Sequence, residues 1–181
     1  MSWWRRFTEK ITGGVRLPEG VQVPLTGEER IMAVAELAGG GHLVATSYAL
    51  VVAEDEEQRR ISWHLVSKAV WGNDVLVVTE AAEQGEAGEA VLLADLPPRR
   101  YPLAQPAKLP DVVHARVTGS IRSTHRHELP GGGAWFVQRK IPGRDGVLLQ
   151  VRADPGTDEA AVRALAADVA RKLREAQANA F

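Results

Sequence analysis

The sequence predicts a mainly β protein of the α+β class, an antiparallel β-barrel or two-sheet roll of about seven or eight strands capped by a C-terminal helix. Three features of the 181 residues indicate this fold. Apolar and polar residues alternate through 30–71 and again through 121–152, as strands with one buried face require. Turn-forming residues separate these segments. Finally, residues 158–177 carry an apolar stripe at helical spacing.

The first half is expected to open with three strands in an antiparallel meander. The strands cover residues 30–37, 42–53 and 59–71. A glycine-rich turn at 38–41 and an acidic turn at 54–57 separate them. Because short turns join only antiparallel neighbours, consecutive strands should pair with each other.

Two further strands and an edge strand complete the first half. Gly72, Asn73 and Asp74 form a turn into a strand at 75–78, and residues 81–88 are expected to be a small, acidic, exposed loop. A fifth strand at 89–96 ends at Pro97 and Pro98, because proline cannot donate to a strand ladder. Residues 101–103 are expected to form a short edge strand.

The second half is expected to contain a short helix, a second meander and the capping helix. The short helix covers about 110–118, with Pro110 and Asp111 in its first turn and Gly119 after its end. The meander strands are expected at 121–129, 134–139 and 147–152. The last helix, 158–177, has Thr157 as its N-cap and should cover one open edge of the barrel.

The early strands carry a family resemblance. The second strand has a small-Thr-x-x-x-Leu pattern, the third an Ile-x-Trp pattern and the fourth a Leu-x-Val pattern; the residues are Ala45, Thr46, Leu50, Ile61, Trp63, Leu76 and Val78. These patterns resemble the early strands of bacterial pleckstrin-homology-like domains, and the whole chain is similar to a group of uncharacterised bacterial proteins of this length. The resemblance implies a pleckstrin-homology-like barrel that ends in one helix. The extra sequence between Pro97 and Ser120 departs from that pattern, so no functional residue is transferred from the family.

Composition predicts one cytoplasmic domain over residues 25–181, preceded by a separate N-terminal segment, 1–14. The apolar fraction of 45% and charged fraction of 25% are ordinary for a globular protein. The chain has no cysteine, so it has no disulfide, thiolate nucleophile or cysteine zinc site. The N-terminus lacks the apolar stretch of a secretory signal, and no apolar run approaches the roughly 20 residues of a membrane span.

Charge is distributed unevenly along the chain, although its net value is only −1. Residues 1–96 hold 15 Asp/Glu and 8 Lys/Arg, whereas residues 97–152 hold 3 Asp/Glu and 10 Lys/Arg. Such asymmetry is typical of an anion-binding face. Two other interpretations remain open: the halves attract each other, or the charges are simply solvated.

Within the N-terminal segment 1–14, residues 2–12 are expected to form a short amphipathic helix. Trp3, Phe7 and Ile11 recur at i+4, and Trp4 lies beside them among basic residues. This pattern suits an anchor at the surface of an anionic membrane. The alternative is that the same side chains pack on the barrel or on a second subunit.

No catalytic or metal-binding signature emerges. His125 and His127 share one strand face, but a metal needs more ligands, for which only His114 and Asp111 are near in sequence. Ser62 and His64 share a strand face without an orienting acid. The two runs of three glycines, 39–41 and 131–133, both lack the Gly-Lys-Ser/Thr ending of a phosphate loop. We therefore expect a non-enzymatic protein with no metal and no cofactor.

The best functional candidate in the sequence is a basic surface. Its residues are Arg122, Arg126, Arg139, Lys140 and Arg144. If these bases converge at an open end of the barrel, they could hold an acidic peptide or a phosphorylated group. Specific nucleic-acid binding is not expected, because aromatic residues are not interleaved with the bases. The sequence thus predicts a binding or scaffolding module for a protein or an anionic ligand. A membrane-peripheral protein anchored through Trp3, Trp4 and Phe7 is the first alternative, and a hydrolase or metal-binding enzyme is the second.

Overall fold

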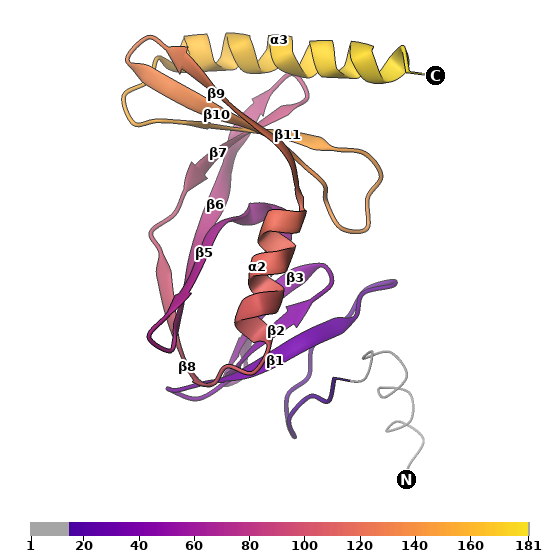
Figure 1. The fold of residues 1–181 in the computed structure, drawn as a ribbon, viewed down its shortest axis with the longest axis vertical. Coiled ribbons are helices and arrows are strands. Elements are labelled where there is room, and N and C mark those ends of the chain that lie inside the picture. The colour runs from indigo at the N-terminus through magenta and orange to yellow at the C-terminus, as the bar shows by residue number, and fades with distance from the viewer. Residues whose placement is uncertain (1–14, 181) are drawn as a thin grey trace. The chain divides into compact units, whose positions relative to one another are not determined.

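The computed structural model describes residues 15–180, which form a mainly β structure with two α-helices (Figure 1). The range expected to be one domain, 25–181, separates into two compact units. In the described residues, unit 1 comprises 15–80 and 97–119, and unit 2 comprises 81–96 and 120–180. Each unit therefore combines segments that are far apart in the sequence.

Unit 1 is an antiparallel sheet followed by a helix. Its elements are β1 (Ile31–Leu37), β2 (His42–Thr46), β3 (Ala49–Glu54), β4 (Glu57–Ser62), the 3-10 turn η1 (Trp63–Leu65), β5 (Val66–Gly72), the first part of β6 (Val75–Ala87), β8 (Arg99–Gln105) and α2 (Leu109–Gly119). Strands pair in the order β4-β3-β2-β1-β8-β6-β5. The ends of this order, β4 and β5, do not pair with each other within the described residues, so backbone pairing leaves the predicted barrel open.

The three strands predicted over 30–71 are in fact five, because two breaks were not expected. The first break is at Ser47 and Tyr48, where the hydroxyl of Thr46 accepts hydrogen bonds from the Tyr48 and Ala49 amides at 3.1 and 2.9 Å and holds a tight turn. The second is η1, where the indole of Trp63 donates to the Thr46 carbonyl at 2.9 Å. The antiparallel meander itself is confirmed.

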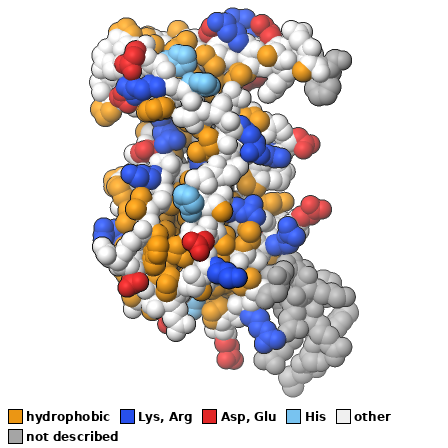
Figure 2. All heavy atoms as spheres, in the orientation of Figure 1, with side chains coloured by type: hydrophobic (Ala, Val, Ile, Leu, Met, Phe, Trp, Pro, Cys, Tyr) orange, Lys and Arg blue, Asp and Glu red, His pale blue; other side chains and the backbone are white. Residues whose placement is uncertain are grey.

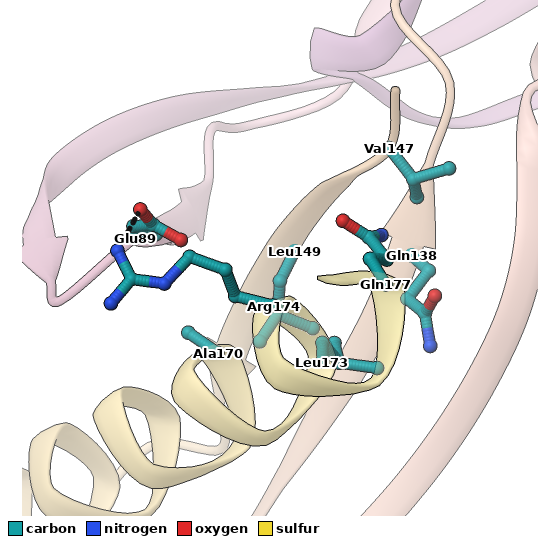
Figure 3. A pocket seen from close by; sticks show the side chains of 8 residues that line it. All are labelled: Glu89, Gln138, Val147, Leu149, Ala170, Leu173, Arg174 and Gln177. Carbon is teal, nitrogen blue, oxygen red and sulfur yellow. Dashed lines mark hydrogen bonds and ion pairs between the residues drawn. The ribbon is translucent and has the colours of Figure 1, made fainter. Parts of the chain in front are cut away.

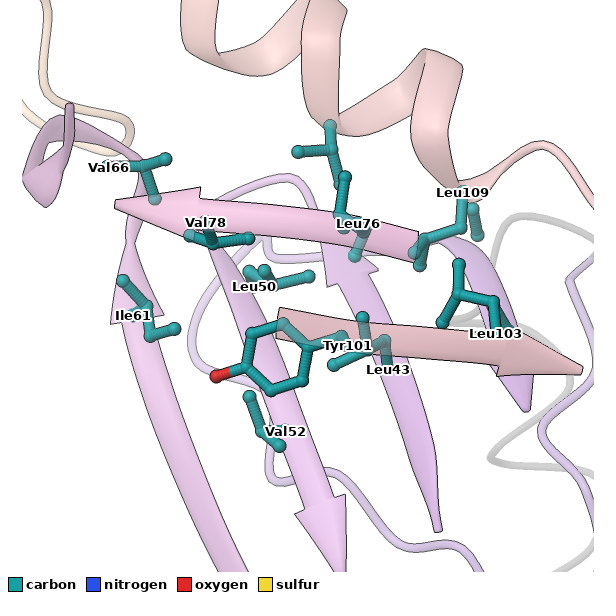
Figure 4. Close-up of a cluster of buried hydrophobic side chains, with 14 of the residues drawn as sticks. Leu43, Leu50, Val52, Ile61, Val66, Leu76, Val78, Tyr101, Leu103 and Leu109 are labelled. Carbon is teal, nitrogen blue, oxygen red and sulfur yellow. The ribbon is translucent and has the colours of Figure 1, made fainter. Parts of the chain in front are cut away.

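A single apolar cluster fills unit 1 on the face that α2 covers (Figure 4). Side chains from every strand of the unit point into it, among them Leu43, Leu50 and Leu76. The fully buried Trp63 of η1 joins the same cluster. Helix α2 packs against β1, β2 and β5 and contributes Leu109, Val113 and Val117. The short helix predicted near 110–118 is thus confirmed, and it is the helix that covers this core.

The opposite face of β1–β3 is covered by the extended segment 15–27 that precedes β1, which we call the lead-in. Ile31, Val44 and Val51 form a second small cluster, on which Val15, Leu17, Val21, Val23 and Leu25 pack. This cover explains why β2 and β3 are buried on both faces.

Two expectations for the middle of the chain were wrong. The loop expected at 81–88 is part of β6, which pairs with β5 and β8 up to Glu80 and with β7 from Ala81 onward. The edge strand expected at 101–103 is β8, which lies between β1 and β6 and buries Tyr101 and Leu103. Small and acidic residues in β6 concealed its strand character because they lack the usual β-branched signal.

Unit 2 is a mixed sheet with one long helix. Its elements are the second part of β6, β7 (Ala90–Asp95), β9 (Ile121–Leu129), β10 (Gly132–Arg139), β11 (Leu148–Ala153) and α3 (Glu159–Ala178). The strand order is β6-β7-β11-β10-β9. The predicted meander β9-β10-β11 is confirmed, and β11 joins β7 in parallel.

Helix α3 lies along the unit 2 sheet (Figure 1). Val162, Ala166 and Ala170 pack on Phe136 and Val151 in a separate core. The sequence predicts that this helix covers one open edge of the barrel; instead, its apolar stripe packs on the apolar face of β7, β10 and β11. Asp158, not Thr157, is the N-cap, and its carboxylate accepts from the Ala161 amide at 2.7 Å.

Candidate binding surface

The charge asymmetry of the sequence disappears within the units. Unit 1 carries 9 Lys/Arg and 11 Asp/Glu in its described residues, and unit 2 carries 10 Lys/Arg and 11 Asp/Glu. The acidic segment 81–96 lies in unit 2 together with six of the ten basic residues of segment 97–152. Asp95 pairs with Arg152 of that segment (3.2 Å), and Glu89 pairs with Arg174 of α3 (2.9 Å). Figure 2 shows cationic and anionic side chains interspersed on the face it draws.

Arg126, one of the five predicted basic residues, is held by two carboxylates. It lies on β9, and its guanidinium contacts the Glu128 carboxylate at 2.9 Å and the Asp154 carboxylate at 2.6 Å. The hydrogen bonds that Arg126 donates to these two carboxylates, Asp154 first, raise the pKa of Arg126, and the contact with Arg126 lowers the pKa of Asp154. Gly133 makes room for this arrangement, because a Cβ there would lie 2.8 Å from Arg126 Nη2.

Trp135 lies next to this ion-pair network. It is opposite Arg126 in the β9–β10 ladder and remains 43% exposed. The guanidinium carbon of Arg126 lies 5.5 Å from the centre of its ring, within the range of a cation–π contact. We call Arg126, Glu128, Trp135 and Asp154 the Trp135 surface. Sequence reasoning missed Trp135 and Asp154, although hairpin pairing across residues 130–131 would have placed Trp135 opposite Arg126.

Arg139 is buried, with only 1% of its surface exposed. Its Nε donates to the Ser120 hydroxyl at 2.8 Å. Burial, with a smaller contribution from the positive charge of Arg152, lowers its pKa to about 10. A side chain in this position supports the β10 strand and does not present its charge to a ligand.

The remaining predicted bases do not converge with Arg126. Arg122 is exposed on β9 at the β-bulge between Ile121 and Ser123, whereas Lys140 follows β10 and Arg144 lies in the exposed loop before β11. Arg139 is four residues from Trp135 on β10, a separation of about 13 Å along a strand. The five bases therefore span the sheet and do not form one compact anion site. Trp3, Trp4 and Phe7 lie outside the described residues.

The histidines occupy the other face of β9. His127 packs edge-on against Phe136, with ring centres 4.7 Å apart, and His125 is exposed. Their sequence-suggested metal partners, His114 and Asp111, belong to α2 in unit 1. Across residues 15–180, no three His, Asp or Glu side chains are grouped to hold a metal ion. Ser62 and His64 do not share a strand face as expected, because η1 begins between them.

Two cavities flank α3 in unit 2. The larger has a volume of about 320 Å³ and is lined by both ends of the Glu159–Arg163 ion pair (3.0 Å) together with Gln84, Leu92 and Thr157. The smaller, about 50 Å³, is shown in Figure 3; Glu89 and Arg174 pair at its rim and Leu149 and Leu173 form its apolar wall. Charged groups at both cavities are thus satisfied by each other.

No helix within residues 15–180 combines the length and the apolar character needed to cross a bilayer. Comparison with protein-family models, with curated proteins and with solved structures finds no match to this chain.

Proposed function

We propose that this chain is a non-catalytic binding module, built from a pleckstrin-homology-like unit 1 and a unit 2 that presents the Trp135 surface to a protein partner. Support for the first part comes from the strand sequence of unit 1. Four strands form a meander, three more (β5, β6 and β8) extend it past β1, and α2 follows directly and covers the core. In this view, residues 81–96 are an insertion between β6 and β8, the last two strands of unit 1.

A contact between β4 and β6 also supports a barrel-like unit 1. The Arg59 guanidinium on β4 pairs with the Glu80 carboxylate on β6 and donates to the Tyr101 hydroxyl at 3.2 Å. These side chains connect the two sides of the sheet that backbone pairing leaves open. The Glu80 carboxylate raises the pKa of Arg59, as expected for a guanidinium that stays charged in this contact.

The observation that carries the binding proposal is the exposed but fixed state of Trp135. A tryptophan that is 43% exposed leaves apolar surface in water, and the guanidinium over its ring is itself held by two carboxylates. Tryptophan and arginine are the residues most enriched among energetically dominant contacts of protein interfaces. A fixed pair loses little conformational entropy when a partner binds.

A protein partner fits this surface better than a small anion. The positive charge of Arg126 is shared with Glu128 and Asp154, so a phosphate would have to compete with two carboxylates. A protein surface that covers the indole ring needs no such competition, since it gains from apolar burial.

The test compares two exposed tryptophans. Full-length tagged protein is used to capture partners from lysate of the source cells, with Trp135→Ala as the variant and Trp71→Ala as its matched control. Trp71 is 39% exposed but lies on β5 of unit 1. We expect a specific partner that Trp71→Ala retains and that Trp135→Ala loses by at least about tenfold, as expected for loss of a dominant contact.

Other outcomes separate the alternatives. Equal capture by both variants would refute the proposed surface. Capture that survives Trp135→Ala but is lost in the Arg122→Glu/Arg126→Glu variant would favour an acidic or phosphorylated ligand instead.

A further inference from the structure

We propose that Arg30 and Arg116 form a binding site on unit 1 for an oxyanion, the phosphate or carboxylate group of a small ligand. Arg30 directly precedes β1, and Arg116 lies in the second half of α2. The site therefore joins the start of the sheet to the helix that covers its core. It belongs to unit 1 alone and stands independently of the Trp135 surface.

Arg116 is a half-buried arginine whose guanidinium meets only a sulfur atom. Its Nε and Nη2 lie 3.0 and 2.7 Å from the Sδ of Met32, and within residues 15–180 the guanidinium has no other hydrogen-bond acceptor and no carboxylate partner. Met32 reaches it because a β-bulge between Ile31 and Ala33 makes Met32 an extra residue of β1. A thioether is a weak acceptor without charge, so the positive charge of Arg116 is not balanced.

Two other arginines of unit 1 show what Arg116 lacks. The side chains of Arg59 and Arg60 are each 38% exposed, and each pairs with a carboxylate, that of Glu80 or that of Glu29. Partial burial of a cation costs free energy, and an ion pair offsets that cost. Arg116 thus resembles one half of such a pair, with the anion missing from the described part of the chain.

Arg30 adds a second positive charge at the same place. Its backbone is fixed beside the turn between β2 and β3, because its amide donates to the Ser47 hydroxyl at 3.0 Å and its carbonyl accepts from the Ser47 amide at 2.8 Å. Burial lowers the pKa of Arg116, and the nearby charge of Arg30 lowers it further. Arg30 also has no ion pair within residues 15–180, so the two guanidinium groups repel each other with no carboxylate between them.

An oxyanion between these groups removes both the burial cost and the repulsion. A planar guanidinium presents pairs of N–H donors that match two oxygens of a phosphate or a carboxylate. Met32 contacts the Nε–Nη2 edge of Arg116, and Nη1 keeps its donors for a ligand. Chloride has no paired oxygens, so the site should prefer oxyanions to chloride at equal ionic strength.

The first test measures thermal stability with and without an oxyanion. Full-length protein is unfolded in a chloride buffer that contains no phosphate, sulfate or carboxylate, and again with inorganic phosphate at the same ionic strength. For a dissociation constant on the order of 1 mM, about 20 mM phosphate should raise the melting temperature by about 4–7 °C. Phosphate also stabilises folded proteins in general through exclusion from their surfaces, so the specific effect is the rise that Arg116→Met loses.

Arg100→Met is the matched control. Arg100 lies on β8 of unit 1 and has no ion pair within residues 15–180, but it is exposed and therefore hydrated. This variant should respond to phosphate as the wild type does.

The stability of Arg116→Met in the phosphate-free buffer separates an anion-binding role from a structural one. This variant replaces a half-buried, unbalanced charge with an apolar side chain next to Met32, so without an anion it should melt above the wild type. In about 20 mM phosphate the wild type alone should gain the specific rise.

Binding itself is followed through the Nε–Hε nuclear magnetic resonance signal of Arg116 during titration with inorganic phosphate or with acetate. Arg30→Gln should weaken phosphate binding at least about tenfold, because one of two charged donors is lost. Tighter binding of phosphate than of acetate would identify a phosphorylated ligand, and the reverse order would identify a carboxylate ligand.

Two results would overturn the proposal. One is a phosphate-induced rise in melting temperature that is equal in wild type, Arg116→Met and Arg100→Met. The other is a folded Arg116→Met protein that melts below the wild type in phosphate-free buffer, which would show that the arginine serves packing on Met32. Circular dichroism of each variant shows whether it is folded.

Discussion

The buried carboxylate of Glu29 provides the sharpest test of how unit 1 is held together. Its side chain is fully buried where the lead-in enters β1. It accepts hydrogen bonds from the Thr46 hydroxyl, the Thr26 amide (3.1 Å) and the Arg60 guanidinium. Thr46 in turn holds the turn between β2 and β3, so Glu29 links the lead-in, that turn and β4.

Glu29→Gln keeps the size of the side chain and removes its charge. Charge-assisted hydrogen bonds contribute about 1.5–3 kcal/mol each, but the Arg60 side chain is 38% exposed and regains hydration when it loses its partner. We therefore expect the free energy of unfolding to fall by about 2 kcal/mol. For a chain of this length, that change lowers the melting temperature by about 4–8 °C.

The difference in unfolding free energy between wild type and Glu29→Gln should depend on pH, and this dependence follows from the pKa of Glu29. Burial alone would raise it, but hydrogen bonds from Thr46, Arg60 and Thr26 outweigh burial and bring the pKa below its ordinary value of 4.5. A carboxyl with a lowered folded pKa stabilises the protein above its unfolded pKa. That stabilisation is lost as pH falls through the folded value. The difference in unfolding free energy between wild type and Glu29→Gln should therefore be largest at pH 7 and should shrink below pH 4.5.

Thermal unfolding followed by circular dichroism from pH 7 to pH 3 measures this gap. Glu28→Gln is the control, because Glu28 precedes Glu29 but is exposed. Equal melting temperatures for the two variants at pH 7, or a gap that does not change with pH, would contradict the role given to Glu29.

Three further predictions use equally local changes. Gly41→Ala should lower the free energy of unfolding, measured by urea titration, by more than about 2 kcal/mol, because the φ of Gly41 is +86° and a Cβ there would lie 2.4 Å from the Ala53 carbonyl oxygen. Gly39→Ala is the control: open space surrounds Gly39, so the same titration should show little effect. Asp158→Ala should lower the free energy of unfolding by about 1 kcal/mol, because it removes the N-cap of α3. An unchanged free energy of unfolding would show that this N-cap does not stabilise the protein. If the membrane-peripheral alternative holds, deleting residues 1–12 should abolish sedimentation with anionic liposomes, whereas binding that survives the deletion would exclude that segment as the anchor.

Several elements could be predicted because their signals are local. Strand alternation in 31–37 and 121–139 and the apolar stripe of α3 each depend on residues within a few positions. The break at Ser47 and Tyr48 could not be predicted in this way, because it depends on a Thr46 hydroxyl that bonds to both sides of the turn.

The candidate site shows the same limit. Arg126 and Arg139 look alike in the sequence, but one lies on the surface between two carboxylates and the other is buried beside Ser120. Nothing near either residue in the sequence indicates that difference, because their environments are set by partner strands. The partners Asp154 and Ser120 are 28 and 19 residues away.

By itself, the sequence determined the mainly β class, the two meanders and both helices, since hydrophobic period and turn residues are properties of short segments. Only the tertiary structure decided that residues 81–96 join 120–180, that α2 rather than α3 covers the first core, and that the uneven charges neutralise within each unit. Those outcomes depend on which apolar faces and opposite charges meet after the chain folds, and such pairings are contacts between distant segments that no local pattern encodes.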